Sequence, residues 1–220
     1  SGHWPARLVL VEGKILKPGQ SQLAHLRLEN PVCVWPGDRI VIRNWPESAT
    51  LAGGRVLDAQ GDRKTLRTTN HKTFLRTRAG APLEASVWIT SQLGRDGLVK
   101  RQTLLRPSHF SPCQIGEAVS VLVGKGTALA IGDWLVDEAR WNTLCNACEA
   151  RVDEEHAQHP ELHGLALEQL RPTIEKAFPG HDIFNELISE LCRNGFKKQQ
   201  SHIARVGHKP ALPPHLREAG

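Results

Sequence analysis

Residues 1–58 alternate short β-type stretches with Pro- and Gly-containing turns, and this pattern stops at a polar joint over residues 59–66. The stretches are 7–11, 22–28, 39–43 and 55–57, and the clearest turns are 17–20 and 35–38. Short strands with such punctuation predict a small barrel. About 55 residues supply too few strands to close one, because closure needs a complete circle of strands. We therefore expect only part of a barrel, over residues 1–60.

After the joint, the periodicity changes to that of short helices. Helical stretches are predicted over 71–77, 82–93 and 98–105, and a hairpin is predicted with strands 118–122 and 127–131 around the turn Gly124-Lys125-Gly126. Three short helices followed by a hairpin is the order of a winged helix, which belongs to the helix-turn-helix class. We expect this domain over residues 67–134.

The same order then repeats. Helices are predicted over 141–152, 167–178 and 183–192, followed by a second hairpin over 196–206. The third of these helices carries apolar pairs every four residues, the strongest helical signal in the chain. A tandem repeat of small domains follows, with a second winged helix over 135–208 and the start of a third over 209–220. The predicted fold is therefore mixed and multi-domain: a partial β-barrel, then two tandem winged-helix (α+β) domains.

Charge is unevenly distributed along the 220 residues, which carry a net charge of +5 and have an isoelectric point near 9.1. Ten basic and three acidic residues lie between Asp62 and Pro107, whereas eight acidic and two basic residues lie between Asp133 and Glu161. A polarised chain of this kind suits a protein that offers one face to nucleic acid. Two solvated faces without a ligand would give the same pattern.

Basic side chains near the predicted third helix and the hairpins are the candidate nucleic-acid contacts. In a helix-turn-helix the third helix reads the groove, and a basic wing contacts phosphates. The candidates are Arg95, Lys100, Arg101, Lys125, Lys197, Lys198 and Arg205. Each of them could instead serve only to keep the surface solvated.

Cys145 and Cys148, with His156, His159 and His163 downstream, contain the elements of a zinc site. Both cysteines fall on the apolar face of one predicted helix, and zinc patterns normally pair two short ligand modules around a loop. We expect the cysteines to fill the core and no metal to bind. An odd number of cysteines, five, in a chain long enough for its own core indicates reduced thiols in a cytoplasm.

No enzymatic site is expected in this chain. It has no Gly-x-x-x-x-Gly-Lys-Ser/Thr loop for a nucleotide phosphate, and no nucleophile is placed on a strand-to-helix elbow. No apolar run is long enough to span a bilayer, and no secretory signal is visible. The sequence contains no methionine, which, together with the incomplete barrel, predicts an interior piece of a longer protein.

Three segments resemble the end of the third domain of elongation factor Tu-like translation GTPases, and most closely the bacterial selenocysteine-specific elongation factors. They are Ser21–Glu29, Gly37–Arg43 and Thr50–Asp58. Ala52 stands where these proteins usually have the first of three glycines. The stretch His159–Leu165, followed by Leu170-Arg171, is similar to the second winged helix of that family.

The resemblance implies a parent GTPase that uses GTP and magnesium and delivers selenocysteinyl-tRNA to the ribosome. In that family the last two of four winged helices bind a messenger RNA hairpin that recodes UGA. This chain would be the connector between the tRNA-binding barrels and the hairpin-binding tip. It would hold no cofactor, and it would be a cytoplasmic monomer that does not bind membranes. Its partners, selenocysteinyl-tRNA, the messenger RNA hairpin and the ribosome, would be reached through the parent protein.

Two alternatives from other functional classes remain open at this point. The first is a winged-helix DNA-binding regulator with a β extension, which would also bind phosphates. The second is a zinc-dependent module built around Cys145 and Cys148.

Overall fold

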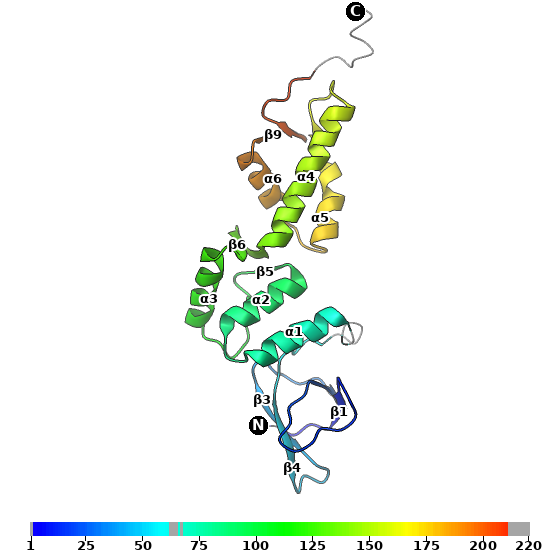
Figure 1. Ribbon diagram of the computed structural model, residues 1–220, viewed down its shortest axis with the longest axis vertical. Coiled ribbons are helices and arrows are strands. Elements are labelled where there is room, and N and C mark those ends of the chain that lie inside the picture. Colours follow the sequence, from blue (N-terminus) through cyan, green and yellow to red (C-terminus); the bar gives the residue numbers. More distant parts are fainter. Residues whose placement is uncertain (1, 62–65, 67, 211–220) are drawn as a thin grey trace, which may run out of the picture. The chain divides into compact units, whose positions relative to one another are not determined.

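The computed structural model describes residues 2–61, 66 and 68–210, and the chain divides into two compact units (Figure 1). The first unit comprises Ser1–Arg95 and Lys100–Gly124, and the second comprises Asp96–Val99 and Lys125–Gly220. Most of the expected third winged helix, residues 211–220, lies outside the described residues, as do Arg63, Lys64 and Arg67 of the basic stretch.

Four short strands occupy the predicted barrel region of the first unit. They are β1 (Ala6–Leu10), β2 (Ala24–Leu28), β3 (Arg39–Arg43) and β4 (Thr50–Arg55). They form two separate antiparallel sheets, β1–β2 and β3–β4. Among residues 2–61, no hydrophobic side chain of the described chain is buried. The region therefore has strands but no core of its own.

The predicted strands over 7–11, 22–28 and 39–43 are confirmed, whereas the strand over 55–57 is wrong. Strand β4 begins at Thr50 and passes through Gly53 and Gly54, which lie opposite Val41 and Ile40 of β3. A Cβ atom at Gly54 would lie 3.2 Å from Ile40 Cγ1. The glycines therefore make room for a neighbouring side chain within the sheet.

Three helices follow in the first unit, but the third is not where the sequence predicted it. The helices are α1 (Thr69–Gly80), α2 (Ala85–Asp96) and α3 (Pro112–Gly124). The predicted helix over 98–105 is wrong, because Gly97 at φ +82° ends α2 and the chain continues as strand β5 (Leu98–Lys100) and a series of turns. The predicted strand over 118–122 is wrong too, because it lies within α3.

A buried arginine joins the barrel region to the helices of the first unit. Arg78 on α1 is only 2% exposed, and its guanidinium donates to the Leu57 carbonyl at 2.8 Å. It also donates to Ser91 Oγ and Gln92 Oε1, each at 3.0 Å. The central carbon of the guanidinium, Cζ, lies 4.0 Å from the centre of the Phe74 ring. A buried charge needs such a full set of partners, so this contact fixes α1 and α2 to the end of the barrel segment.

Four helical elements, two hairpins and one short strand build most of the described part of the second unit. The helical elements are α4 (Glu138–Gln158), the 3-10 turn η1 (Leu167–Leu170), α5 (Arg171–Ala177) and α6 (Phe184–Arg193); the strands are β6 (Ala128–Ile131), β7 (Trp134–Asp137), β8 (Leu165–Ala166), β9 (Phe196–Gln199) and β10 (His202–Arg205). The predictions for α4, α6 and the second hairpin are confirmed. The predicted helix over 167–178 is a 3-10 turn followed by a short α-helix. The first hairpin turns at Gly132-Asp133 between β6 and β7, not at Gly124-Lys125-Gly126.

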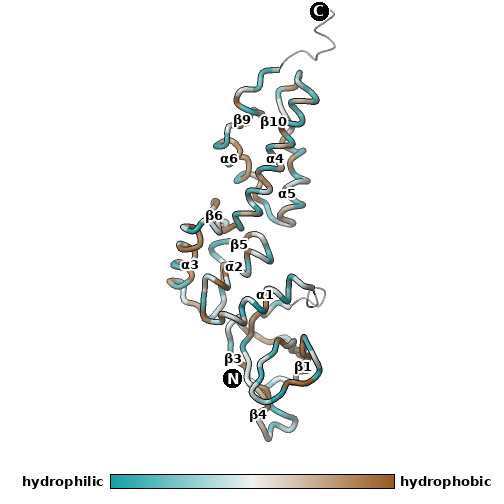
Figure 2. Tube along the Cα trace, viewed as in Figure 1, coloured by the Kyte–Doolittle hydropathy of each residue, from teal (hydrophilic) through white to brown (hydrophobic). Residues whose placement is uncertain are grey.

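One hydrophobic core holds the second unit together. Hydrophilic and hydrophobic stretches alternate along its helices (Figure 2). The core takes Trp141, Cys148 and Val152 from α4, and Leu187 and Leu191 from α6. Leu98 of β5 and Val136 of β7 belong to the same cluster. The sheet β5–β7–β6 therefore contributes side chains to the core that the last three helices build.

The two three-stranded sheets have the same topology. In each, the first strand in sequence pairs with the third, and the third lies in the middle, giving the orders β5–β7–β6 and β8–β10–β9. Each sheet is preceded by a helix and ends in a hairpin. Between its first and second strands the first sheet has one helix, α3, whereas the second has the 3-10 turn η1 and the helices α5 and α6. Helix α1 has no counterpart in this repeated order.

No helix within the described residues combines the length and the hydrophobicity needed to cross a bilayer.

Candidate nucleic-acid interface

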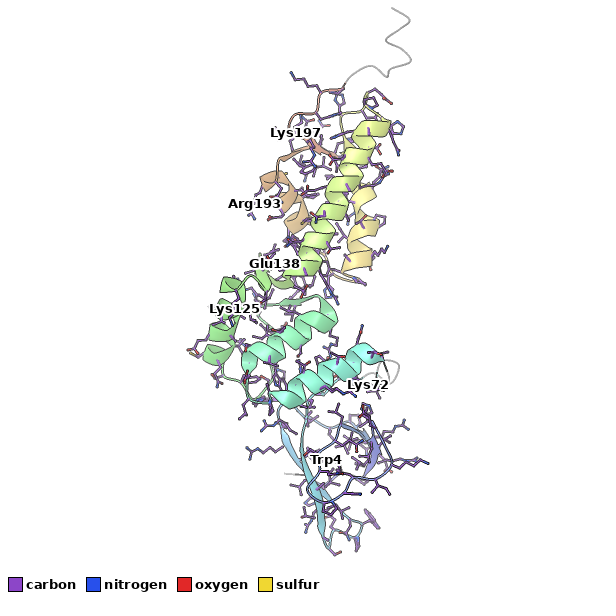
Figure 3. The ribbon with its side chains drawn as sticks, viewed as in Figure 1. Trp4, Lys72, Lys125, Glu138, Arg193 and Lys197 are labelled. Atoms are coloured by element: carbon purple, nitrogen blue, oxygen red, sulfur yellow. The ribbon has the colours of Figure 1, made fainter. Side chains whose placement is uncertain are left out.

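The hairpin β9–β10 presents two lysines on a firmly anchored strand. Gly195, at φ +90°, ends α6, and Phe196 then buries its ring at the start of β9. Ile203 of β10 is fully buried. Lys197 projects from β9 (Figure 3). Lys197 is half-buried and Lys198 is exposed, and neither forms an ion pair with any residue that the structure describes. Such side chains can contact phosphates without disturbing the core.

Arg205, on the partner strand, is committed to an ion pair. Its Nε lies 2.6 Å from Asp153 Oδ1 and its Nη2 lies 2.7 Å from Asp153 Oδ2. The hydrogen bonds from Arg205 lower the pKa of the Asp153 carboxyl, and the same bonds raise the pKa of Arg205. The guanidinium also lies 4.5 Å from the centre of the Phe196 ring. Arg205 therefore fastens the hairpin to α4.

Arg95 lies in the last turn of α2 and, like Arg205, contacts residues of its own unit. Its Nη1 is 3.5 Å from Asp58 Oδ2, and the two side chains are only 28% and 11% exposed. Its guanidinium lies 4.3 Å from the centre of the Phe74 ring. Both contacts tie α2 to the end of the barrel segment and to α1.

The other three candidates from the sequence lie on turns or a strand end, not on a groove-reading helix. Lys100 is the last residue of β5, and Arg101 is exposed in the turn that follows. Lys125 is exposed directly after α3 (Figure 3). Placing Lys100 and Arg101 on a third helix is therefore wrong, because that segment is a strand and a turn.

The last helix before the hairpin of each repeat, α3 in the first and α6 in the second, carries little positive charge. Helix α3 contains no lysine or arginine at all, and α6 contains Glu186 and Glu190 against Arg193. A helix that enters the major groove normally presents basic and amide side chains to phosphates and base edges. Neither helix has the chemistry of a groove reader.

The register of the barrel strands shows a basic pair that the sequence did not reveal. Arg7 of β1 lies directly opposite Arg27 of β2, and both are exposed. Like charges directly across a sheet repel, and no ion pair to either residue is found in the described part of the chain. Alternation over residues 22–28 predicted the second strand, but only the pairing register brings the two arginines together.

Cys145 and Cys148 are core residues. Their exposed fractions are 6% and 0%. Burial raises the pKa of Cys145 to about 12 and that of Cys148 to about 11, so both remain thiols at neutral pH. Metal ligands are thiolates, which such burial disfavours. Within the described residues, no three His, Cys, Asp or Glu side chains are grouped to share a metal ion.

Comparison with known proteins identifies the relatives of the chain. Residues 1–73 match the family described as "Selenocysteine-specific elongation factor, beta-barrel domain". The selenocysteine-specific elongation factor of Desulfomicrobium baculatum is 26% identical over 94% of this chain. The chain is related to SelB, the selenocysteine-specific elongation factor. The SelB resemblance of the sequence is thereby confirmed.

Two further comparisons extend the SelB relationship along the chain. The selenocysteine-specific elongation factor of Haemophilus influenzae is 23% identical over 88% of the chain. A crystal structure of a bacterial selenocysteine-specific elongation factor, EF-Sec, superposes with a TM-score of 0.56 at 14% identity and covers 98% of the chain, which shows a shared fold. The chain spans about a third of these proteins: 33% and 30% of the two curated relatives and 31% of the crystallised chain.

Proposed function

We propose that this chain is the connecting arm of a selenocysteine-specific elongation factor, between barrels that bind selenocysteinyl-tRNA and a tip that binds a messenger RNA hairpin. Residues 1–60 are the end of the barrel, 67–134 and 135–208 are two winged helices, and 209–220 begin a third. The relationship to SelB and the repeated strand order of the two sheets support this assignment.

The arm contacts RNA through unpaired cations on its strands and not through a groove-reading helix. Lys197 and Lys198 on the second hairpin and the Arg7–Arg27 pair on the first unit are the contacts that we propose. Lys198, Arg7 and Arg27 are exposed and Lys197 is half-buried. None of the four forms an ion pair within the described residues, which supports this role. Contacts of this kind recognise phosphates without reading sequence.

The parent protein would hydrolyse GTP and work with the ribosome in the cytoplasm as a monomer. The residues present here do not fit GTP and its magnesium ion, because the sequence contains no Gly-x-x-x-x-Gly-Lys-Ser/Thr loop. GTP binding and hydrolysis therefore have to be supplied by other parts of such a protein.

A winged-helix DNA-binding regulator is the competing function. The single observation that weighs most against it is the composition of α3, which is the last helix before the hairpin of the first repeat and has no basic residue. The acidic residues of α6 weigh in the same direction, since a negative helix repels the backbone of DNA.

Fluorescence anisotropy with labelled nucleic acids separates the two functions. We expect the chain to bind a mixed-sequence RNA strand and an RNA hairpin at low salt with similar affinity. Selection from a pool of duplex DNA should yield no preferred sequence. A duplex bound about 10³-fold more tightly than random DNA would establish the regulator and contradict the proposed arm.

A further inference from the structure

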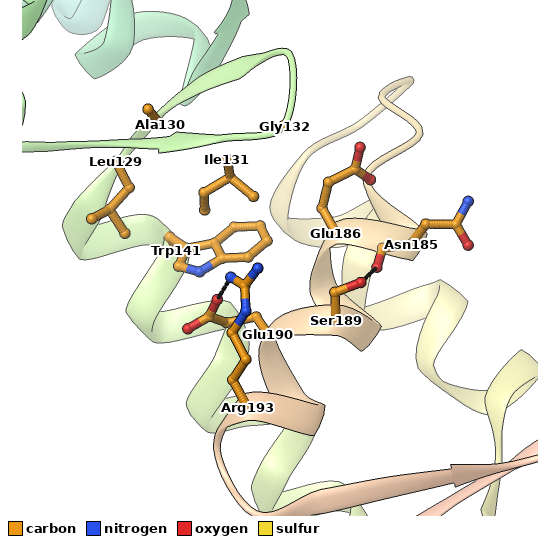
Figure 4. A pocket seen from close by; sticks show the side chains of 10 residues that line it. All are labelled: Leu129, Ala130, Ile131, Gly132, Trp141, Asn185, Glu186, Ser189, Glu190 and Arg193. Carbon is orange, nitrogen blue, oxygen red and sulfur yellow. Dashed lines mark hydrogen bonds and ion pairs between the residues drawn. The ribbon is translucent and has the colours of Figure 1, made fainter.

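A hollow of about 460 Å³ opens on the second unit between the first hairpin and α6 (Figure 4). One wall is the outward face of α6, which carries Glu186, Ser189, Glu190 and Arg193, with Asn185 beside them. The other wall is formed by Leu129, Ala130, Ile131 and Gly132 of the hairpin, and Trp141 lies at the base. This volume lies within the range of sites that bind small groups or side chains.

The polar wall of the hollow has an excess of negative charge. Glu190 is paired with Arg193, whose Nη1 lies 3.1 Å from Glu190 Oε2. Glu186 forms no ion pair with any residue in the described ranges. Its carboxylate lies beside Gly132, where a Cβ atom would be 3.4 Å from Glu186 Oε1. One uncompensated carboxylate therefore faces an opening that a larger residue at 132 would narrow.

The opposite side of the hollow is apolar. Leu129 and Ile131 are partly buried against the core, and Trp141 is 2% exposed beneath them. A ligand that fits must bring positive charge for Glu186 and an aliphatic or planar surface for Ile131. An arginine side chain combines both properties, since its guanidinium forms paired hydrogen bonds with a carboxylate and its stem is apolar.

We propose that this hollow is a docking site for an arginine side chain of a basic peptide segment in a protein partner. Charge complementarity decides between ligand classes, because the phosphates of a nucleotide would be repelled by Glu186 and Glu190. The site is independent of the RNA contacts on the second hairpin, and it stands whether or not the chain acts as the arm of an elongation factor.

The test uses the full chain and two peptides, acetyl-Gly-Arg-Gly-amide and its citrulline counterpart, which keeps the shape and removes the charge. Chemical shifts of the Trp141 indole N–H, followed by NMR, report binding at the base of the hollow. We expect a saturable shift with the arginine peptide and none with the citrulline peptide. No saturable shift, an equal response to citrulline, or a shift caused only by an RNA oligonucleotide would each overturn the proposal.

Two variants locate the binding. Glu186→Gln removes the charge and should weaken binding of the arginine peptide about tenfold, since it replaces charge-assisted hydrogen bonds with weaker neutral ones. Ser189→Leu fills the opening with its charge unchanged and should also weaken binding. The matched control is Glu84→Gln, at an exposed glutamate just ahead of α2 in the other unit. Unchanged affinity in Glu186→Gln, or an equal loss in Glu84→Gln, would contradict the site.

Discussion

The imidazole ring of His208 lies parallel to that of His156, with the ring centres 3.8 Å apart and the planes inclined by 6°. His156 lies in the last turn of α4, and His208 follows β10. A second contact holds the same segment, because His208 Nε2 lies 2.9 Å from the Leu162 carbonyl oxygen. The stack thus fastens the chain that leaves the hairpin to the end of α4.

Acidification should loosen this stack. Burial is the main reason why the pKa of His156 is lowered, and the positive charge that His208 can carry is the second. Arg205 also lowers this pKa, whereas Asp153 and Glu155 raise it. The Nε2 atom of His156 is buried without a hydrogen-bond partner among the described residues. Because the folded state disfavours the proton, stability is complete above the ordinary histidine pKa of about 6.5 and falls as the pH drops through and below that value.

His156→Phe tests this pH dependence, since phenylalanine can stack and cannot be protonated. Between pH 7.5 and 5.5, the melting temperature of this variant should fall less than that of the wild type. His163→Phe, at an exposed histidine, is the control and should retain the wild-type loss. If His156→Phe loses as much stability on acidification as the wild type, the stack does not sense pH.

Asp153→Asn should weaken the attachment of the hairpin to α4. The free energy of unfolding should fall by about 0.5–1 kcal/mol at neutral pH, the range for partly exposed ion pairs. Arg205 lowers the pKa of Asp153, so the pair stabilises the fold above the ordinary aspartate pKa, and the effect is lost as the pH falls through the lowered value. Urea unfolding over a series of pH values from 7 downwards measures both. A difference between the variant and the wild type that does not shrink as the pH falls would contradict the ion pair.

Arg78→Met should destabilise the first unit strongly. The substitution keeps the buried volume but leaves the Leu57 carbonyl and Gln92 Oε1 without their donor. Breaking a buried, fully bonded charge costs about 3–5 kcal/mol. Denaturant unfolding monitored by tryptophan fluorescence measures the loss, and Arg101→Met, at an exposed arginine in the same unit, is the control. Equal midpoints for the two variants would show that Arg78 does not hold the helices to the barrel segment.

Leu187→Ala should cost about 2–5 kcal/mol, because Leu187 is completely buried in the core of the second unit. Leu162→Ala, at a leucine that is 43% exposed in the same unit, is the control and should change stability by about 0.5 kcal/mol or less. Urea unfolding compares the two variants. If Leu187→Ala loses no more stability than the control, α6 does not pack in the core as described.

Strong periodicity made the second unit predictable, and weak periodicity explains the errors in the first. Residues 183–192 carry apolar pairs over a whole helix, and α6 follows them closely. The run Ala118–Leu122 is short and apolar, so it suits a strand as well as a buried helix. The deciding signal was a capping box: Ser111 Oγ accepts from Gln114 N, and Gln114 Oε1 accepts from Ser111 N.

The candidate interface was only partly predictable because contacts across elements set the role of each cation. The hairpin around Lys197 and Lys198 follows from local pattern alone. The pairing of Arg205 with Asp153 joins residues 52 positions apart, and the pairing of Arg7 with Arg27 depends on strand register. Neither relationship is encoded in local spacing, so Arg205 was expected as an RNA contact and the Arg7–Arg27 pair was missed.

The salt dependence of RNA binding tests the central claim most directly. Anisotropy titrations with an RNA hairpin give log K against log salt for the wild type, for Lys197→Ala with Lys198→Ala, and for the control Lys14→Ala with Lys17→Ala. We predict that the hairpin variant reduces the slope by about 1–2 and weakens binding, since each lost phosphate contact removes nearly one unit. An unchanged slope and affinity in a folded hairpin variant would contradict the proposed RNA-contacting arm.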